Sequence, residues 1–308
     1  MIKVFIDGKA GTTGLRIYER LEKRDDIEIV SLSEHLRKDE GARRDAINSS
    51  DVVFLCLPDD AARAAVSLVE NPNTIVIDAS TAHRTAEGWA YGFPELSDAH
   101  REAIKNSKRI ANPGCYASGF ISIVYPLVKE GVIAPDYPLT CHAVSGYSGA
   151  GKKGIEQYES KTRAPGFDTP RLYALGLTHK HLPEMVKVCG LTRTPVFNPY
   201  VCDYYAGMTV NIPLHIDLFR RRCTVDQVFE LFAEYYARHK FISVTQNSED
   251  GFLSANSLVG TNRLEIFVGG NEGQILLSAR LDNLGKGASG AAIQNMNLAL
   301  GLDEALSL

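Results

Sequence analysis

Short apolar runs with helical patterns between them recur through the first 115 residues of the chain. Their Val and Ile content is typical of strands that are buried on both faces. Strands that alternate with helices indicate a parallel sheet covered on both sides, which is a doubly wound α/β architecture. The predicted strands are KVFID (3–7), IEIVSLS (27–33), DVVFLCLP (51–58), TIVIDAS (74–80) and RIANPGC (109–115), with helices over 15–24 and 59–70 among them.

The pattern changes after about residue 135, where longer runs alternate between apolar and polar residues. This alternation predicts an antiparallel or mixed sheet with helices on one face. Thr224 and Gln227 have the spacing of a capping box, so a helix is predicted over 224–240. The last predicted helix, over 287–301, is rich in small residues that suit close packing. The long strands are predicted over 139–146, 207–216, 262–270 and 273–283.

These patterns predict two domains. The first is a doubly wound parallel-sheet (Rossmann-like) dinucleotide-binding domain over 1–115 plus 286–308. The second is an α+β catalytic and oligomerisation domain over 116–285, with a mixed or antiparallel sheet.

The composition favours a globular protein, since 44% of the 308 residues are hydrophobic and 23% are charged. A net charge of −4 with only short basic clusters gives no basis for a nucleic-acid partner. We recognise no membrane-spanning run and no signal peptide, and therefore expect a cytoplasmic protein without a membrane partner. The six cysteines lack CxxC spacing and are interpreted as free thiols, and no metal site is predicted.

A glycine-rich turn, Gly8, Gly11 and Gly14, follows the first predicted strand in IDGKAGTTGLRI. Such glycines let the backbone approach a pyrophosphate, whose charge meets free N–H groups at the helix N-terminus. Thr12 and Thr13 add hydroxyl donors. A tight strand-to-helix turn also requires glycine without any ligand, but the position after the first strand of an α/β pattern favours a dinucleotide site.

The end of the second strand indicates which dinucleotide binds, because an acidic residue there would hold the ribose 2′-hydroxyl of NAD. Ser33 comes first here, with Arg37 and Lys38 beyond it. Hydroxyl and cationic groups suit a 2′-phosphate, so we predict NADP(H). Glu34 would serve as the acidic residue if the strand ended one step later. Pro58 lies in a loop that either passes the cofactor or simply ends the third strand.

One cysteine is set apart by its sequence context. Cys115 follows Pro113 and Gly114 in NPGCYASGF and precedes apolar residues at helical spacing. It is therefore predicted at a helix N-terminus, which favours an anion and can lower the pKa of a thiol from about 8.5 by one to several units. A thiolate at the carboxyl edge of a parallel sheet is placed to act as a nucleophile beside a dinucleotide. The alternative is a small buried residue that fills a turn.

Two histidines are candidates for the proton partner that such a nucleophile needs. His179 and His181 stand two residues apart in GLTHKHLPEM, so both point the same way on extended backbone. Either is suited to acid/base catalysis near neutral pH. Two surface histidines, or a metal site with a distant third ligand, would produce the same spacing.

Several segments together resemble the N-acetyl-γ-glutamyl-phosphate reductase family, specifically its shorter subclass. GKAGTTGLRI is similar to the nucleotide loop of that family, and NPGCY is similar to its nucleophile motif. YGFPEL (91–96), HKHLPEM (179–185) and NLGKGASGAAIQNMNL (283–298) also resemble family segments, so the likeness runs nearly end to end. PGC alone would also admit aspartate-semialdehyde dehydrogenases.

The resemblance implies that Cys115 accepts the acyl group and that His181, alone or with His179, is the acid/base. DASTAHR (78–84) differs from the DLSADFR of longer relatives, which leaves phosphate or carboxylate binding open among Arg84, Arg109 and Lys152. SGYSGAGKK (145–153) resembles the family's loop near the nicotinamide. Implied cofactor contacts are Gly8, Gly11, Thr12, Thr13, Gly14, Ser33, Arg37, Pro58, Ser145, Gly149, Gly151, Asn283 and Lys286, and implied substrate contacts are Arg84, Asn112 and Glu184.

The implied reaction is NADPH-dependent reduction of N-acetyl-γ-glutamyl phosphate to N-acetylglutamate 5-semialdehyde through a thioester on Cys115, in arginine biosynthesis. Its partners would be the acyl phosphate and inorganic phosphate, and the family's habit is a homo-oligomer, a dimer or tetramer. One alternative is a reductase of another acyl phosphate, of the aspartate-semialdehyde dehydrogenase kind. A cofactor-free Cys–His acyl hydrolase and a noncatalytic NADP-sensing module are further alternatives.

Overall fold

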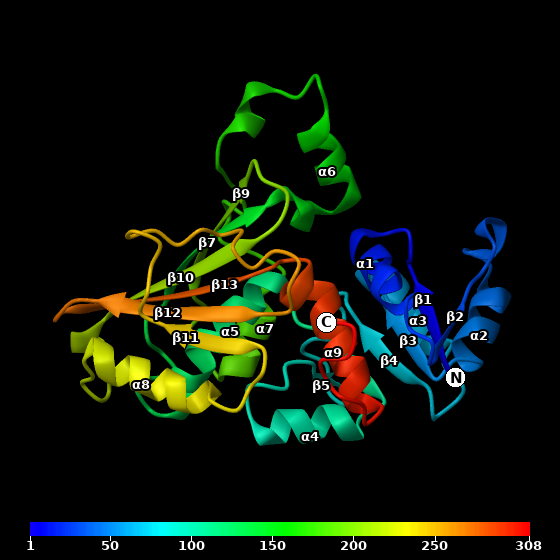
Figure 1. Cartoon of the computed structure of the whole chain (residues 1–308), viewed down its shortest axis with the longest axis horizontal. Coiled ribbons are helices and arrows are strands. Elements are labelled where there is room, and N and C mark those ends of the chain that lie inside the picture. The colour runs from blue at the N-terminus through cyan, green and yellow to red at the C-terminus, as the bar shows by residue number, and fades with distance from the viewer. The chain divides into compact units, whose positions relative to one another are not determined.

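The computed structural model describes residues 1–308, and the chain divides into two units, Met1–Gly114 with Ala288–Leu308 and Cys115–Gly287. The first unit alternates strands and helices as predicted (Figure 1). Its strands are β1 (Ile2–Asp7), β2 (Ile27–Val30), β3 (Val52–Leu55), β4 (Ile75–Asp78), β5 (Ala90–Tyr91) and β6 (Arg109–Ala111). Its α-helices are α1 (Thr12–Leu21), α2 (Glu40–Asn48), α3 (Asp59–Ser67), α4 (Asp98–Asn106) and α9 (Gly290–Ala299).

All six strands of the first unit are parallel, in the order β2-β1-β3-β4-β6-β5. One face of the sheet is covered by α1, α4 and α9, through buried residues such as Ile17, Ile104 and Ile293. The other face is covered by α2 and α3, through Ile47 and Ala62. The prediction of a doubly wound, Rossmann-like sheet is therefore confirmed. The strand order reverses between β1 and β3, and ligands of such sheets bind at the carboxyl ends of the strands at this point.

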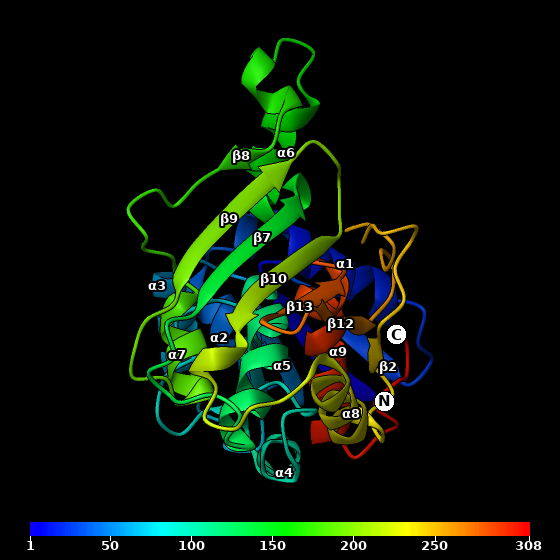
Figure 2. The ribbon, with the colours of Figure 1, turned by 90° about the vertical axis from the view of Figure 1, so that its left-hand side faces the viewer.

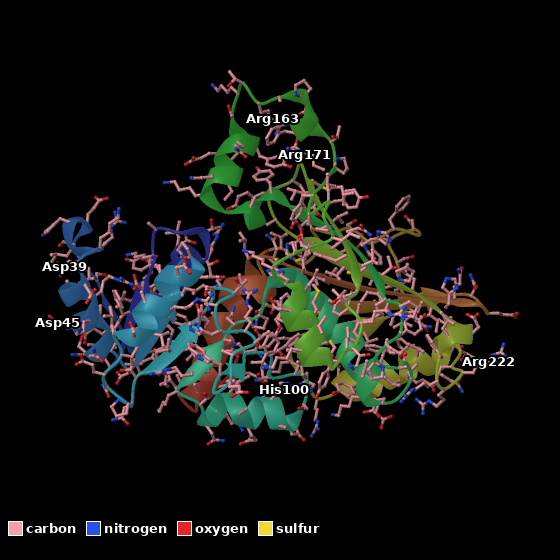
Figure 3. The ribbon with its side chains drawn as sticks, turned by 180° about the vertical axis from the view of Figure 1, so that it is seen from behind. Asp39, Asp45, His100, Arg163, Arg171 and Arg222 are labelled. Atoms are coloured by element: carbon pink, nitrogen blue, oxygen red, sulfur yellow. The ribbon has the colours of Figure 1, made fainter.

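The elements at this edge of the sheet differ slightly from their predicted bounds. α1 begins at Thr12 rather than at residue 15, so the two threonines of the glycine-rich turn lie in its first turn. β2 ends at Val30 rather than at residue 33, and a short 3₁₀ helix (Glu34–Leu36) follows. Asp39 begins α2 by accepting a hydrogen bond from the Ala42 amide at 2.8 Å (Figure 3).

The second unit contains seven strands in the order β11-β12-β13-β10-β7-β9-β8. Figure 2 shows β9, β7 and β10 side by side. The strands are β7 (Thr140–Gly146), β8 (Arg171–Leu172), β9 (Val196–Cys202), β10 (Met208–His215), β11 (Ile242–Thr245), β12 (Leu264–Gly270) and β13 (Gln274–Leu281). The α-helices are α5 (Cys115–Lys129), α6 (Gly151–Glu159), α7 (Leu182–Cys189) and α8 (Val225–Tyr236).

The sheet of the second unit is mixed, as predicted: β7 pairs with β9 and β11 with β12 in parallel, while the other pairs are antiparallel. Alternate residues of β10 are buried, for example Val210 and Ile212, because α5 packs on this face. The approach is close at Gly119 of α5, where an added Cβ would lie 2.6 Å from the side chain of Val210.

A lobe containing α6 extends from the ends of β7 and β9 (Figure 1). Arg163 and Arg171 lie on this lobe (Figure 3). Arg163 forms ion pairs with Asp168 and Asp203, both at 2.6 Å, and the Arg171 guanidinium stacks 4.1 Å from the ring centre of Phe167. None of the helices of the two units combines the length and the apolar character that crossing a bilayer requires.

The predicted capping box starts α8. The Thr224 hydroxyl accepts a hydrogen bond from the Gln227 amide at 3.2 Å, and the Thr224 amide donates to the Gln227 side chain at 3.0 Å. We expect Thr224→Ala to lower the free energy of unfolding by about 1 kcal/mol, because an orphaned amide of the first turn loses its acceptor. Urea denaturation measures this change. Thr224→Ser keeps the hydroxyl and serves as the control, so an equal loss in both variants would count against the cap.

Candidate active site

Cys115 is the first residue of α5, as its Pro-Gly context predicts. The strand β6 ends at Ala111, and the buried residues Asn112–Gly114 connect it to the 15-residue helix. Cys115 is partly exposed, and no acidic residue stands in the first turn of α5. Its sulfur therefore lies at the N-terminal, positive end of the α5 helix dipole, the position that stabilises a thiolate.

Most other cysteines are in environments that suppress ionisation. Burial raises the pKa of Cys56 to about 12, and burial also raises the pKa of Cys141, Cys189 and Cys202. Cys223 is buried, and its thiol donates to the main-chain oxygen of Arg221. Because the thiolate is the nucleophilic form, these cysteines are poor candidates for covalent chemistry.

A π-helical turn, Gly285–Ser289, lies against Cys115. A Cβ added to Gly287 would lie 2.7 Å from the Cβ of Cys115, so only glycine allows this approach. The turn was predicted as part of a regular helix over 287–301, but α9 begins only at Gly290. π-helical turns occur frequently at functional sites, and this one shapes the surroundings of the sulfur.

His179 and His181 lie directly before α7 and contact each other, with ring centres 4.7 Å apart and ring planes nearly perpendicular. The main-chain amide of His181 donates a hydrogen bond to Nδ1 of His179 at 3.1 Å. Nδ1 of His179 must therefore be unprotonated, and the proton of the neutral ring is on Nε2. Nε2 is 3.4 Å from the hydroxyl of Tyr173, which can accept that proton in a hydrogen bond.

Tyr116, His179 and His181 form a cluster of rings, and Tyr116 is the residue next to Cys115 at the start of α5. Its ring centre is 5.8 Å from that of His179 and 6.0 Å from that of His181, and it directly follows Cys115 in the chain. Burial raises the pKa of Tyr116 and of Tyr173, and the charge of Cys115 raises both pKa values further. Tyr116 thus connects the pair of histidines to the helix that begins at Cys115.

Neither tyrosine was singled out from the sequence. Tyr116 belongs to the NPGCY motif, so its position next to the predicted nucleophile is the sequence signal that could have identified it. Tyr173 belongs to no motif and reaches the cluster from the segment after β8. Tyr116 is held in place by its hydroxyl, which is 2.7 Å from the hydroxyl of Ser145 in β7. Ser145, predicted to contact the cofactor, is therefore hydrogen-bonded to the cluster and is 4% exposed.

Asn283, Gly149 and Gly151, predicted to contact the cofactor, lie at the turn that follows β7. The Asn283 side chain accepts from the Gly207 amide at 2.8 Å and donates to the Ser148 hydroxyl at 2.9 Å. A Cβ added to Gly149 would lie 3.4 Å from the Asn283 amide nitrogen, and Gly151 has a φ of +71°. Lys286 is 2% exposed, with its ammonium 5.6 Å from the ring centre of Phe241.

Three predicted basic residues occupy different places. Arg84 donates to the main-chain oxygens of Asn112 at 2.9 Å and Ala79 at 3.1 Å, at the carboxyl ends of β6 and β4. Arg109 is the first residue of β6, where its guanidinium donates to the main-chain oxygen of Thr74 at 3.1 Å. Lys152 is exposed in the first turn of α6.

Asn112 and Glu184, both predicted to bind substrate, are each 1% exposed. Glu184 is the third residue of α7, next in sequence to the two histidines, where the helix dipole stabilises its negative charge. Asn112 lies in the connection that leads to Cys115, three residues before it. No group of three or more His, Cys, Asp or Glu side chains has an arrangement that could hold a metal ion.

The glycine-rich turn fits a pyrophosphate. Gly8 has a φ of +89°, and a Cβ on it would lie 2.3 Å from the main-chain oxygen of Cys56, directly after β3. A Cβ on Gly14 would lie 2.6 Å from the main-chain oxygen of Gly8. The N-cap of α1 is Gly11, no side chain caps the helix, and no acidic residue stands in its first turn. The first amides of α1 are therefore left for an anion, with the hydroxyls of Thr12 and Thr13 in the same turn.

The residues predicted to contact the adenosine part of the cofactor lie on the surface of the same unit. Ser33 is the N-cap of the 3₁₀ helix, and Arg37 at its end forms an exposed ion pair with Glu34 at 2.6 Å. Pro58 is the N-cap of α3 and immediately follows the end of β3. The only acidic side chain at the end of β1, Asp7, is buried and paired with Arg43 at 2.7 Å.

Comparison with known proteins agrees with this arrangement. Residues 3–107 match the family described as "Semialdehyde dehydrogenase, NAD binding domain", and residues 115–283 match "Semialdehyde dehydrogenase, dimerisation domain". An aspartate semialdehyde dehydrogenase II from Vibrio cholerae, solved in complex with ASA, is 16% identical with a TM-score of 0.75 and covers 98% of each chain. The enzyme from Francisella tularensis is 14% identical with a TM-score of 0.73 and covers 97% of this chain and 99% of its own. These structures share the fold.

Closer relatives are curated under one name. The "N-acetyl-gamma-glutamyl-phosphate reductase 2" of Nostoc sp. is 48% identical and covers 99% of each chain. The protein of the same name from Pseudomonas putida is 46% identical over 97% of this chain and 96% of its own. The "N-acetyl-gamma-glutamyl-phosphate reductase" of Burkholderia cenocepacia is 45% identical over 98% of each chain. The chain therefore belongs to the N-acetyl-γ-glutamyl-phosphate reductase family, as the resemblance of its motifs predicted.

Proposed function

We propose that this protein reduces N-acetyl-γ-glutamyl phosphate to N-acetylglutamate 5-semialdehyde with NADPH, releasing phosphate, in arginine biosynthesis. The observation that carries the proposal is that Tyr116, the residue next to Cys115 at the start of α5, contacts both His179 and His181, in a chain that belongs to this reductase family. A cofactor-free Cys–His hydrolase would leave the uncapped glycine turn of α1 without a purpose.

The first half of the reaction is acyl transfer to the enzyme. The Cys115 thiolate attacks the acyl carbon, the C–O bond to phosphate breaks, and a thioester with Cys115 remains. The departing phosphate takes up one proton, and we assign the donation of this proton to His181. Main-chain N–H groups at the start of α5 are available to stabilise the oxyanion that forms during the attack.

The second half reduces the thioester. Reduced nicotinamide, when bound, supplies the hydride that the thioester carbon accepts. His181 regains from solvent the proton that it gave to phosphate. The carbon bound to the Cys115 sulfur then carries an oxyanion, and we assign to His181 the proton that this oxygen takes up. As the C=O bond of the aldehyde forms, this proton returns from the oxygen to His181, the C–S bond breaks, and Cys115 leaves as the thiolate.

The two histidines have different roles in this proposal. Nδ1 of His179 accepts the His181 amide, so protonating that atom would cost the hydrogen bond. His179 is therefore assigned to hold the backbone of His181 in place, as a neutral ring that also contacts Tyr173. His181 is assigned the proton transfer.

The cofactor proposal is NADPH rather than NADH. Ser33 and Arg37 offer a hydroxyl and a guanidinium after β2, where a 2′-phosphate would be recognised. Arg37 is held by Glu34 through an exposed ion pair, which is weak and available for exchange with a 2′-phosphate. The pyrophosphate is assigned to the turn from Gly8 to Gly14.

The unit Cys115–Gly287 is assigned to homo-oligomer formation, a dimer or tetramer, which is supported by its match to a dimerisation domain. The sheet face away from α5 carries exposed apolar side chains, including Val196 of β9 and Leu276 of β13. All six cysteines are free thiols, which supports a reducing compartment, the cytoplasm.

The test is the reverse reaction, because the acyl phosphate substrate is unstable. We expect phosphate-dependent reduction of NADP⁺ with N-acetylglutamate 5-semialdehyde. With NAD⁺ in place of NADP⁺, or with aspartate semialdehyde as the substrate, kcat/KM should be at least about 10-fold lower. A loss of this size is expected when protein groups that bind the 2′-phosphate or the acetyl group are left unpaired. Absorbance at the reduced-nicotinamide band measures both. Phosphate-independent turnover, or a preference for aspartate semialdehyde, would contradict the assignment.

A further inference from the structure

Every polar group of Asn112 is bonded within the first unit. Its main-chain amide donates to the Asp78 oxygen at 2.8 Å, and its main-chain oxygen accepts from Nε of Arg84 at 2.9 Å. Its side-chain nitrogen donates to the Ala288 oxygen at 2.9 Å, and its side-chain oxygen accepts from the Asn295 side chain at 3.1 Å. Four segments of the chain, β4, the loop after it, the π-helical turn and α9, thus converge on one residue that is 1% exposed.

Only Pro113 and Gly114 separate Asn112 from Cys115. Both are buried, and the proline ring fixes its own φ angle. Because Pro113 and Gly114 are both buried, the groups packed around them resist their movement, and a shift of the Asn112 backbone is passed on to the first residue of α5. Asn112 therefore sets where the nucleophilic sulfur lies, and its bonded side chain favours this role over direct contact with substrate.

Asn295 is the member of this arrangement most distant in sequence from the nucleophile. It is fully buried in α9, and its side-chain nitrogen donates to the Gly92 oxygen at 2.9 Å as well as to Asn112. A Cβ on Gly92 would lie 2.4 Å from that nitrogen, so the approach requires glycine. The Gly92 amide in turn donates to the Ala111 oxygen at 2.8 Å, at the end of β6. Asn295 is thus hydrogen-bonded to Gly92 and to Asn112, the two segments that meet at the end of β6.

We propose that Asn295 is a positioning residue for Cys115, acting through Asn112. This inference rests on the proposed role of Cys115 as the nucleophile. An amide is suited to the task because its two protons satisfy two acceptors at once, whereas an aspartate would present oxygens to both of them.

The neighbouring helix position supplies a matched control. Asn297 is also a fully buried amide of α9, but it donates to the Leu306 oxygen at 2.9 Å and accepts from Arg24 at 2.9 Å. Its bonds hold the C-terminal segment and not the Asn112 connection. Alanine at either position removes buried hydrogen bonds of similar number, so the two variants should lose similar stability.

The experiment compares Asn295→Ala with Asn297→Ala in the full-length protein. The readouts are the Tm, the Kd for NADP⁺, kcat and KM, and the rate constant for alkylation of Cys115 by iodoacetamide, followed on the peptide that contains it. We expect Asn295→Ala to lower kcat and the alkylation rate constant by about 10- to 100-fold, the size of effect that a displaced reacting group produces. KM and the Kd for NADP⁺ should change less than about twofold, as a displaced nucleophile alone implies.

Asn297→Ala should lower Tm comparably and leave kcat and the alkylation rate constant as in the wild type. Equal kcat and alkylation rate constants in the two variants would overturn the proposal. If Asn295→Ala does not fold, Asn295→Ser is the substitute, since its short hydroxyl cannot reach Asn112, and the same criteria apply. Alkylation needs no substrate, so the two proposals can fail separately. A wild-type protein whose Cys115 reacts with iodoacetamide but which has no reductase activity would refute the proposed function. Slower alkylation of Cys115 in Asn295→Ala would still support the positioning role.

Discussion

Cys115→Ser is expected to abolish phosphate-dependent NADP⁺ reduction, with turnover at least about 10⁴-fold below that of the wild type, since covalent catalysis loses its nucleophile. Serine keeps the size of the side chain, but at neutral pH its hydroxyl is not ionised, even at the N-terminus of α5. The glycine turn belongs to the other unit and is unchanged, so the Kd for NADP⁺ should stay within about twofold of the wild-type value. Stopped-flow absorbance and fluorescence titration measure the two quantities.

The matched control is Cys202→Ser. Cys202 is also partly exposed, but burial raises the pKa of its thiol, and it lies at the end of β9 without a helix dipole. This variant should retain wild-type turnover. Iodoacetamide at neutral pH should modify Cys115 first, and N-acetylglutamate semialdehyde should protect it. Appreciable turnover by Cys115→Ser would show that no thioester forms and would end the covalent mechanism.

The architecture of the first unit was predictable because its strands are buried on both faces. Runs such as VVFL in β3 have no polar alternation, which only a sheet covered on both sides accommodates. The strand ends were less predictable. The IEIVSLS run predicts a strand to residue 33, yet pairing with β1 stops at Val30, which lies opposite Phe5, although β1 itself continues to Asp7. Pairing depends on the partner strand, which a local pattern does not contain.

The nucleophile could be predicted because its signals are local. Pro113 and Gly114 end the strand, and helical periodicity begins directly after Cys115, so the helix N-terminus follows from neighbouring residues. The residues that hold it in place are far away in sequence. Asn295 is 183 residues from Asn112, and only the packing of α9 on the sheet brings the two amides together. A buried Asn in a helix of small residues gave no indication of its partner.

The same distinction applies to the two histidines. Their spacing identified them as a pair but did not separate their roles, because two histidines on extended backbone are equivalent in sequence. The decisive feature is a main-chain hydrogen bond: the His181 amide donates to the His179 ring, which requires a turn into α7 rather than an extended strand. The segment is not extended, so the premise that both rings point the same way was wrong, although the rings do meet.

His181→Asn is expected to lower kcat by about 10²- to 10⁴-fold, the usual contribution of a general acid/base, with little change in the Kd for NADP⁺. The asparagine side chain cannot take up and release a proton, so the departing phosphate and the thioester-derived oxygen both lose their donor. The pH dependence of kcat should change as well, since the titrating group has been removed. Initial rates across the neutral pH range measure both effects.

His179→Asn is the matched variant, because the asparagine side-chain oxygen can occupy the place of Nδ1 and still accept the His181 amide. If His179 only holds His181 in position, this variant should lose about 10-fold or less in kcat and keep the pH dependence of the wild type. His179→Ala removes the acceptor altogether and should lose more than His179→Asn. A larger loss at His179→Asn than at His181→Asn would reverse the assignment, because this variant keeps the acceptor for the His181 amide and the loss would then lie at the proton-bearing Nε2 side of the ring.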